Sequence, residues 1–375
     1  MVGWGLPLLL AAVSGASALA PLPTGGGLGV VSAIPGRSPS QHYAVQVRDA
    51  AAASSAPWQQ SFVLETAQKP CGGADCPAAN HGGYFKHLDG FSSSWTNVML
   101  PQGRGTAGVR LRLSRVGGTA VSAAKIHPAR ANATVTSISG NGVELLVTGP
   151  AQFTVTLDGG LDDVDTGPSY KGPPIHTFSA FINPYLAAPS GAGVVTVPAG
   201  APIPALPAGT KTLLFAPGEH RLPTALPAWP VYSLPSGITV HVPPSAILYF
   251  ALLSNASHAD IKLEGHGSVS GEEMTRCHEQ QGAADTSKDC TNNSPQGLTL
   301  KNVAHADISG VTFVDFPNHH IIAAASERPD GWSKPCAASS ASRMTNIKVM
   351  GWRANGDVRV PPRTQQRCCA RSRWL

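Results

Sequence analysis

Two short stretches near the carboxyl end of the chain hold side chains suited to acid–base chemistry. The first, VMGWRANGD, reads as a strand that ends on the carboxylate of Asp357. The second, FVDFPNHHI, brings together Asp315, Asn318 and His319. A positioned carboxylate can act as a general base, and the reaction then needs a second group that supplies a proton. Asp315 and Asn318 are also turn-forming residues, and His319 with His320 also fits a solvated corner, so a purely structural interpretation stays open.

The elements that must position these groups are predicted to be β-strands. Charged residues make up only 13% of the 375 residues, while Gly (40) and Pro (33) are abundant, which is typical of a turn-rich all-β chain. Short Val, Ile, Leu and Thr runs recur between Gly, Pro, Asn and Asp, without the sustained period of a helix. The length allows two domains.

The first of these domains is predicted to be a β-sandwich over residues 41–185. Segments such as HYAVQVRD and QFTVTLDGG alternate with turns, and the alternation puts Phe153, Val155 and Leu157 on one face. One buried face for each strand suits two packed sheets. The preceding residues 21–40 are rich in Gly, Pro and Ser, and we expect them to be flexible.

From about residue 190 the strands shorten, and a repeat emerges. The segments ADIKLEGHG, ADISGVTF and TNIKVMGW share a frame that aligns Ile261, Ile308 and Ile347. Their separations of 47 and 39 residues are near twice a repeat of about 20 to 24, which indicates a stacked solenoid. We therefore predict a right-handed parallel β-helix over 190–357, with these isoleucines stacked inside it. A second sandwich is the alternative, although Asn-Gly hairpin turns are scarce here.

The net charge of +5 belongs to the last 18 residues, 358–375, which hold five arginines and no acidic residue. Removing them leaves 22 basic and 22 acidic residues. No other basic patch with interleaved aromatic residues is present, so we expect no nucleic-acid partner.

The amino-terminal end predicts export. Residues 1–20 combine an apolar run with a small-residue ending, as in a secretory signal peptide, and the run is shorter than the ~20 residues of a membrane span. We expect a secreted monomer with no membrane segment. Three Asn-x-Ser/Thr sequons fit this route, at Asn132, Asn255 and Asn292.

The seven cysteines favour disulfides over a metal site. Cys71 with Cys76, and Cys277 with Cys290, are close enough in sequence to staple two loops. Zinc sites use spacings such as Cys-x-x-Cys, which are absent. The pairing of the other three stays open, namely Cys336, Cys368 and Cys369. The acidic run LDGGLDDVD lacks the closing carboxylate of a calcium loop, so we expect no metal and no cofactor.

The ordered series LLFAPGEHRL, LPSGITVHVPPSAIL, IKLEGHGSVSGE, ISGVTFVDFPNHHI and NIKVMGWRANGD resembles the dextranase–isopullulanase family of glycoside hydrolases. It resembles the polygalacturonases more distantly, which share the pectin-lyase-like β-helix. Upstream, FTVTLDGG and IHTFSAFINPY resemble the end of the β-sandwich in the dextranase group. The match covers roughly residues 120–357. It implies an inverting endo-hydrolase of an α-glucan. The Gly-His-Gly at 265–267 is assigned to tight corners of an early coil.

The resemblance also implies roles for single residues. Asp357 aligns with the water-activating aspartate of a Trp-x-x-Asn-Thr-Asp-Gly segment, together with Trp352 and Asn355. Gly356 replaces the usual Thr, and the residue after Asp357 is Val instead of Gly. In this setting Trp352 would stack on a sugar face and His319 would contact sugar hydroxyls.

The general acid of this chemistry is not evident in the sequence. Inverting hydrolysis needs a second carboxyl group ~6.5–9.5 Å from the first, but no Asp or Glu follows Asp357. We therefore expect residues 358–375 to form an irregular tail and the chain to have negligible hydrolase activity. An upstream residue such as Asp315 is one alternative source of the acid. A polygalacturonase-like pectin hydrolase, a non-catalytic carbohydrate-binding β-helix and, more weakly, a polysaccharide lyase are the alternative functions.

Overall fold

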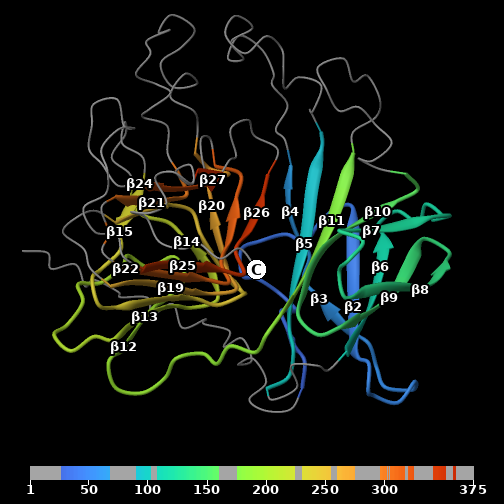
Figure 1. Ribbon diagram of the computed structural model, residues 1–375, viewed down its shortest axis with the longest axis horizontal. Helices are drawn as coiled ribbons and strands as arrows, with labels where there is room; N and C mark the ends of the chain where they lie inside the picture. Colours follow the sequence, from blue (N-terminus) through green and yellow to red (C-terminus); the bar gives the residue numbers. More distant parts are fainter. Residues whose placement is uncertain are drawn as a thin grey trace, which may run out of the picture.

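The computed structural model describes residues 27–67, 90–102, 108–159, 175–223, 230–254, 260–274, 296–301, 303, 305–316, 320–324, 341–351 and 358–359. Every regular element within these ranges is a β-strand (Figure 1). The described part of the chain contains no helix long and apolar enough to cross a membrane. The prediction of an all-β chain is confirmed.

The amino-terminal part forms two sheets, which we call sheets A and B. Sheet A has the order β1-β5-β11-β10-β7, with β4 also paired to β5, and its strands are β1 (Gly29–Val30), β4 (Leu64–Ala67), β5 (Ser92–Met99), β7 (Ala124–His127), β10 (Ala151–Leu157) and β11 (His176–Asn183). Sheet B is antiparallel in the order β3-β2-β6-β9-β8, with strands β2 (Tyr43–Asp49), β3 (Gln59–Ser61), β6 (Gly108–Arg115), β8 (Ala133–Ser139) and β9 (Gly142–Thr148).

Sheets A and B share one hydrophobic core. Alternate residues of sheet B, such as Val45 and Leu111, pack in the same cluster as Phe178 of sheet A. The predicted inward row of Phe153, Val155 and Leu157 also lies in this cluster, and all three side chains are buried. The period-two alternation therefore selected the buried face of β10 correctly.

The carboxyl-terminal part forms three parallel sheets, C, D and E, which stack successive turns of the chain. Sheet C consists of β12 (Val194–Val197), β13 (Thr212–Phe215), β16 (Thr239–Val242), β19 (Ile261–Gly265), β22 (His305–Ser309) and β25 (Ala341–Thr345). Sheet D consists of β14 (Gly218–His220), β17 (Ala246–Leu248), β20 (Ser268–Ser270), β23 (Thr312–Val314) and β26 (Lys348–Met350). Sheet E consists of β15 (Val231–Ser233), β18 (Ala251–Ser254), β21 (Leu298–Lys301), β24 (Ile321–Ala324) and β27 (Val358–Arg359). From β13 onward each turn supplies one strand to each sheet, and β12 adds a first strand to sheet C, so the predicted parallel β-helix is confirmed.

The register of the coils corrects the predicted repeat. Ile308 pairs with Leu263 above it and Met344 below it, whereas Ile261 pairs with Ala306. Ile347 follows β25 and is only partly buried. Ile261 and Ile308 do point inward, but the three isoleucines do not form one column. The separations of 47 and 39 residues each correspond to one turn of the β-helix and not to two. Strand pairing constrains only the strands, so the connections between them can be long.

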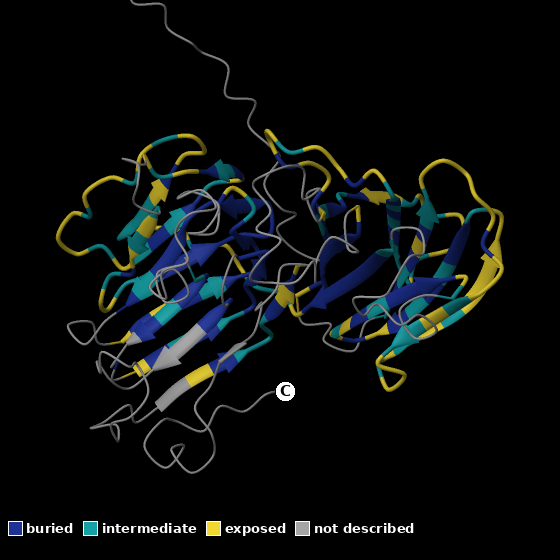
Figure 2. Cartoon of the chain, turned by 90° about the horizontal axis from the view of Figure 1, so that it is seen from above, coloured by how far each residue is buried: buried dark blue, intermediate teal, exposed yellow. Residues whose placement is uncertain are grey.

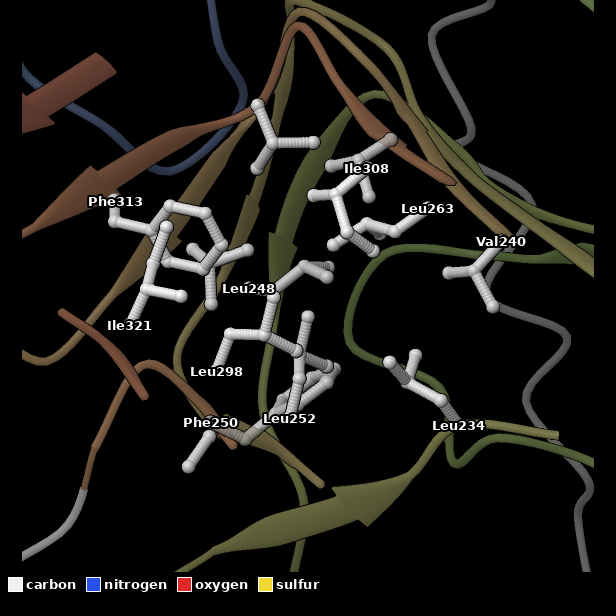
Figure 3. Packing of buried hydrophobic residues seen from close by; sticks show 14 of the residues in the cluster. Leu234, Val240, Leu248, Phe250, Leu252, Leu263, Leu298, Ile308, Phe313 and Ile321 are labelled. Atoms are coloured by element: carbon white, nitrogen blue, oxygen red, sulfur yellow. The ribbon is translucent and has the colours of Figure 1, made fainter. Parts of the chain in front are cut away.

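The interior of the β-helix is filled by apolar side chains from all three sheets (Figure 3). Leu263 and Ile308 of sheet C face Leu248 and Phe313 of sheet D and Leu298 of sheet E across this interior. Each side chain contacts neighbours in its own turn and in the turns above and below, which is how a solenoid buries a continuous core. Figure 2 shows buried residues in dark blue along strands in both halves of the chain.

A smaller apolar cluster joins the two halves of the chain. Trp95 and Phe181 from sheet A pack with Ile247, Val314 and Met350 from sheet D. The outer face of sheet D thus lies against sheet A, while sheet B lies on the far side of the two-sheet domain (Figure 1). This apolar contact joins the two-sheet domain to the β-helix beside Val314 and Met350, the last residues of β23 and β26.

Two segments expected to be irregular contribute to the fold instead. Within residues 21–40, which we expected to be flexible, β1 pairs with β5, and Val31 and Ile34 are buried at the domain junction. Burial of apolar side chains in a Gly- and Pro-rich stretch outweighs its local flexibility. Within the expected tail 358–375, β27 pairs with β24 and continues sheet E. Residues 360–375 lie outside the described ranges.

Candidate functional site at the corner between sheets D and E

The predicted catalytic and substrate-binding residues fall, in the sequence, in two connections that lead from sheet D to sheet E. The connection from β23 to β24 comprises residues 315–320, and the connection from β26 to β27 comprises residues 351–357. Because β23 pairs with β26 and β24 pairs with β27, these two connections begin and end on adjacent strands. We call this region the D–E corner; its described residues include Arg221, Tyr249, Glu272, Asp315, His320 and Gly351.

Asp315 is the predicted catalytic or substrate-binding residue that the structure describes. It follows β23 directly, adopts a left-handed backbone conformation with φ of 46°, and is 5% exposed. Its N–H donates to the carbonyl oxygen of Met350 at 2.8 Å. A carbon atom placed on Gly351 would lie 3.1 Å from Asp315 Oδ1, so this carboxyl group lies against the start of the Asp357 connection. Aspartate tolerates such a conformation better than most residues, so Asp315 also makes the turn.

His320 lies next to the predicted residue His319 in the sequence but is not itself a predicted site residue. It directly precedes β24, is buried, and its carbonyl oxygen accepts a hydrogen bond from the N–H of Leu298 at 2.9 Å. Ile321 pairs with Val358, so His320 and Asp357 directly precede partner residues in sheet E. Leu298 and Ile321 are the first residues of the paired strands β21 and β24. Aligning these two apolar strand starts in the sequence would have placed His320 directly before a strand of sheet E.

The other predicted site residues lie outside the described ranges. They are Asn318, His319, Trp352, Asn355 and Asp357 for substrate and catalysis, Cys71, Cys76, Cys277 and Cys290 for disulfides, and Asn255 and Asn292 for glycosylation. Asn132 is described: it is exposed directly before β8, and its carbonyl oxygen accepts from the N–H of Thr148 at 2.8 Å. Its side chain carries a sequon whose use remains a prediction.

A charge network ties the amino-terminal segment to the D–E corner. Arg37 donates through Nη2 to both carboxylate oxygens of Glu272, at 2.9 and 3.2 Å, and through Nη1 to the hydroxyl of Tyr249 at 2.9 Å. Tyr249 in turn donates to Glu219 Oε1 at 3.0 Å. Burial raises the pKa of the Tyr249 hydroxyl, which therefore stays protonated and able to donate.

A second arginine extends this network outward. Arg221 donates to both Glu273 and Glu219, and its guanidinium lies 4.4 Å from the centre of the Tyr249 ring. Glu272 and Glu273 are therefore both held as arginine-paired carboxylates. Such carboxylates can orient polar groups of a ligand. Among the described residues, no group of three His, Cys, Asp or Glu side chains is arranged to hold a metal ion.

The two arginines differ in burial, and this difference yields a prediction. The Arg37 and Glu272 side chains are 22% and 15% exposed, whereas those of Arg221 and Glu273 are 47% and 46% exposed. We expect Arg37→Ala to lower the free energy of unfolding by about 1–3 kcal/mol, because it leaves Glu272 without its charged donor. Arg221→Ala should cost less than about 1 kcal/mol. Urea unfolding of both variants checks this, and equal losses would contradict it.

Comparison with known proteins places the fold. Dex49A from Penicillium minioluteum has this fold. The match has a TM-score of 0.62 at 16% sequence identity and covers 87% of this chain and 63% of that one. The present chain thus spans 63% of the length of Dex49A. A candidate glycosyl hydrolase from Parabacteroides merdae aligns at 17% identity over 37% of this chain and 61% of its own, with a TM-score of 0.28 that carries no argument.

Comparison of the amino-acid sequence alone finds no related protein or family. No family model matches the chain. No curated protein matches it either. The structural likeness therefore shows the fold, which includes strands from both the two-sheet domain and the β-helix.

Proposed function

We propose that this protein is related in function to the polysaccharide-acting glycoside hydrolases and binds a polysaccharide, with an α-glucan as the favoured class, at the D–E corner. The fold shared with the dextranase Dex49A supports this proposal. The sequence series that ends in NIKVMGWRANGD supports it independently, because it resembles the dextranase–isopullulanase family. We also propose that the protein is secreted, in line with its apolar amino-terminal run and its sequons.

The observation that carries the proposal is the placement of two aspartate-bearing connections on adjacent strands. Asp315 and Asp357 belong to connections anchored by the pairs β23–β26 and β24–β27. Neighbouring parallel strands lie ~4.8 Å apart, so carboxyl groups from two successive turns can meet the ~6.5–9.5 Å separation of inverting hydrolysis. A water molecule fits between carboxyl groups at that separation and attacks the anomeric carbon.

The proposed roles follow from this placement. Asp357 would act as the base that activates water, and Trp352 would stack on a sugar ring. Asn355, Asn318 and His319 would bind sugar hydroxyls.

Among the described residues of the D–E corner, no carboxyl group is placed to supply the acid. Asp315 is 5% exposed, which keeps its carboxyl group from a glycosidic oxygen, and Glu272 and Glu273 are each paired with an arginine. We therefore propose that the 375-residue chain binds the glucan with negligible hydrolysis.

Two assays on the same protein test binding and hydrolysis separately. Affinity electrophoresis in gels that contain dextran or pullulan should show retardation of the chain. Reducing-sugar release from dextran, pullulan and polygalacturonate should stay at background. Trp352→Ala should weaken retardation by about tenfold, since a stacked aromatic ring contributes on the order of 1–1.5 kcal/mol.

Three results would contradict parts of this proposal. Hydrolysis that Asp357→Asn and Asp315→Asn each abolish would show that Asp315 supplies the acid, and the proposal of negligible activity would be wrong. Hydrolysis of polygalacturonate, without hydrolysis of dextran or pullulan, would show that the substrate is a pectin and not an α-glucan. Absence of both retardation and hydrolysis, in a chain with the β circular dichroism of a folded protein, would reject the polysaccharide function.

A further inference from the structure

The outer face of sheet B, away from the β-helix, carries an unusual concentration of arginine. The outward rows of β2 and β6 hold Arg48, Arg110 and Arg112, while the inward rows hold the apolar residues of the core. The register places Arg48 directly opposite Arg110. Like charges in directly opposite positions of an antiparallel pair are destabilising, so this arrangement is unfavourable for the sheet itself.

One carboxylate partly balances these charges. Glu144 on β9 lies 3.1 Å from Arg110 and 3.7 Å from Arg112. Three arginines and one glutamate leave two positive charges on the described part of this face. The Arg112 side chain is 47% exposed, and that of Arg110 is 34% exposed, so both guanidinium groups can reach a ligand.

Trp58 contacts two of the three arginines. It directly precedes β3, whose first residue Gln59 pairs with Val47 of β2. The guanidinium carbon atoms of Arg48 and Arg112 lie 4.5 and 4.4 Å from the centre of its ring. Arg48 is further held by donation to the carbonyl oxygens of Ser54 and Ala56. Stacking on the indole keeps the Arg112 guanidinium in place while its exposed N–H groups stay available for an anion, whereas Arg48 Nη1 is committed to the two carbonyl oxygens and supplies positive charge.

We propose that this face, formed by Arg48, Trp58, Arg110 and Arg112, binds the carboxylate groups of an acidic polysaccharide such as a polyuronate. Planar guanidinium groups match carboxylates in bidentate geometry, which makes arginine the suitable donor for this ligand. Polar neighbours on the same face, including Gln46 opposite Arg112, would serve the sugar hydroxyls. The face is separate from the D–E corner, so the proposal stands whether or not the chain hydrolyses a glucan.

The test measures retardation of the full 375-residue chain in gels that contain polygalacturonate or dextran, at low and high salt. Polygalacturonate should retard the parent at low salt and much less at high salt. The double change Arg110→Gln with Arg112→Gln should weaken this binding at least about tenfold, with retardation by dextran unchanged. Glu144→Gln should strengthen it severalfold, because it frees both arginines, and a merely structural role of these residues would not produce a gain.

The matched control is Arg343→Gln, which removes one positive charge from an exposed position of β25 in the β-helix. It should leave binding within about twofold of the parent. Equal weakening by this control, or no binding of polygalacturonate by the parent, would overturn the proposal. Single-stranded DNA that binds as tightly and loses affinity equally in the double variant would assign the face to polyanions in general and reject the uronate assignment.

Discussion

Replacing Gly265 with alanine should lower the free energy of unfolding by more than about 4 kcal/mol, enough to prevent soluble folding of a marginally stable domain. Gly265 ends β19 with φ of 129°. A Cβ atom there would lie 1.9 Å from the carbonyl oxygen of Val242 in the preceding turn. That oxygen belongs to a stacked backbone, so the clash cannot be relieved by rotation of a side chain. The measurement is the yield of soluble protein and its urea unfolding curve.

Gly237 provides the matched control for this variant. It also has a positive φ, of 69°, but a Cβ atom there would meet no atom within 4 Å. Gly237→Ala should therefore cost only the strain of a left-handed alanine, about 1–2 kcal/mol. If both alanine variants lost the same stability, close stacking of the coils at Gly265 would not be the reason for the glycine.

The second large effect concerns Lys348, a lysine enclosed at the domain junction. Its side chain is 3% exposed, and Nζ donates to Asn183 Oδ1 at 2.8 Å and to the carbonyl oxygen of Gly310 at 2.6 Å. Both acceptors are uncharged, and the Phe181 ring lies 5.5 Å from Nζ. Burial lowers the pKa of Lys348 to about 7. The titratable group coupled to it is His266, whose pKa burial lowers to about 3, so that it stays neutral.

The stability of the parent should therefore rise with pH above neutrality. Below pH 7 Lys348 is protonated in both the folded and the unfolded chain, so the cost of burying its charge is fully present. Between pH 7 and the pKa of ~10.4 in the unfolded chain, only the unfolded state binds this proton, and folding is favoured by about 1.4 kcal/mol per pH unit. Urea unfolding at pH 7, 8 and 9 should show a total gain of about 2 kcal/mol, because the folded-state lysine is already half deprotonated at pH 7; Lys348→Met should remove this gain.

Lys262→Met is the control for this experiment. Lys262 lies on the outer face of sheet C, where its side chain is 46% exposed and pairs with Glu264. This variant should keep the rise in stability of the parent between pH 7 and 9. A Lys348→Met protein with the same rise as the parent would show that the ammonium group is not held in the unfavourable environment inferred here.

The candidate site was only partly predictable from the sequence. The stretch around Asp315 could be selected because a polar group directly after an apolar strand is visible along the chain. Its burial and its contact with the start of the Asp357 connection depend on the pairing of β23 with β26. The Arg37–Glu272 pair joins residues 235 positions apart, and no local pattern connects them. The arginine face of sheet B was missed because Arg48 and Arg110 become neighbours only through the register of β2 and β6.

The sequence by itself determined the class of the fold, the existence of a coil with short strands, and the inward rows such as Phe153 and Val155. These features follow from alternation and composition, which act between residues that are near in the chain. The tertiary structure alone decided which rows stack: Ile308 meets Leu263 and Met344 instead of Ile261 and Ile347. It also decided that the residues just before and just after the predicted domains join the fold, as β1 and β27. The physical reason is that strand pairing and burial reward contacts between distant residues, and the lengths of the intervening connections leave no periodic trace in the sequence.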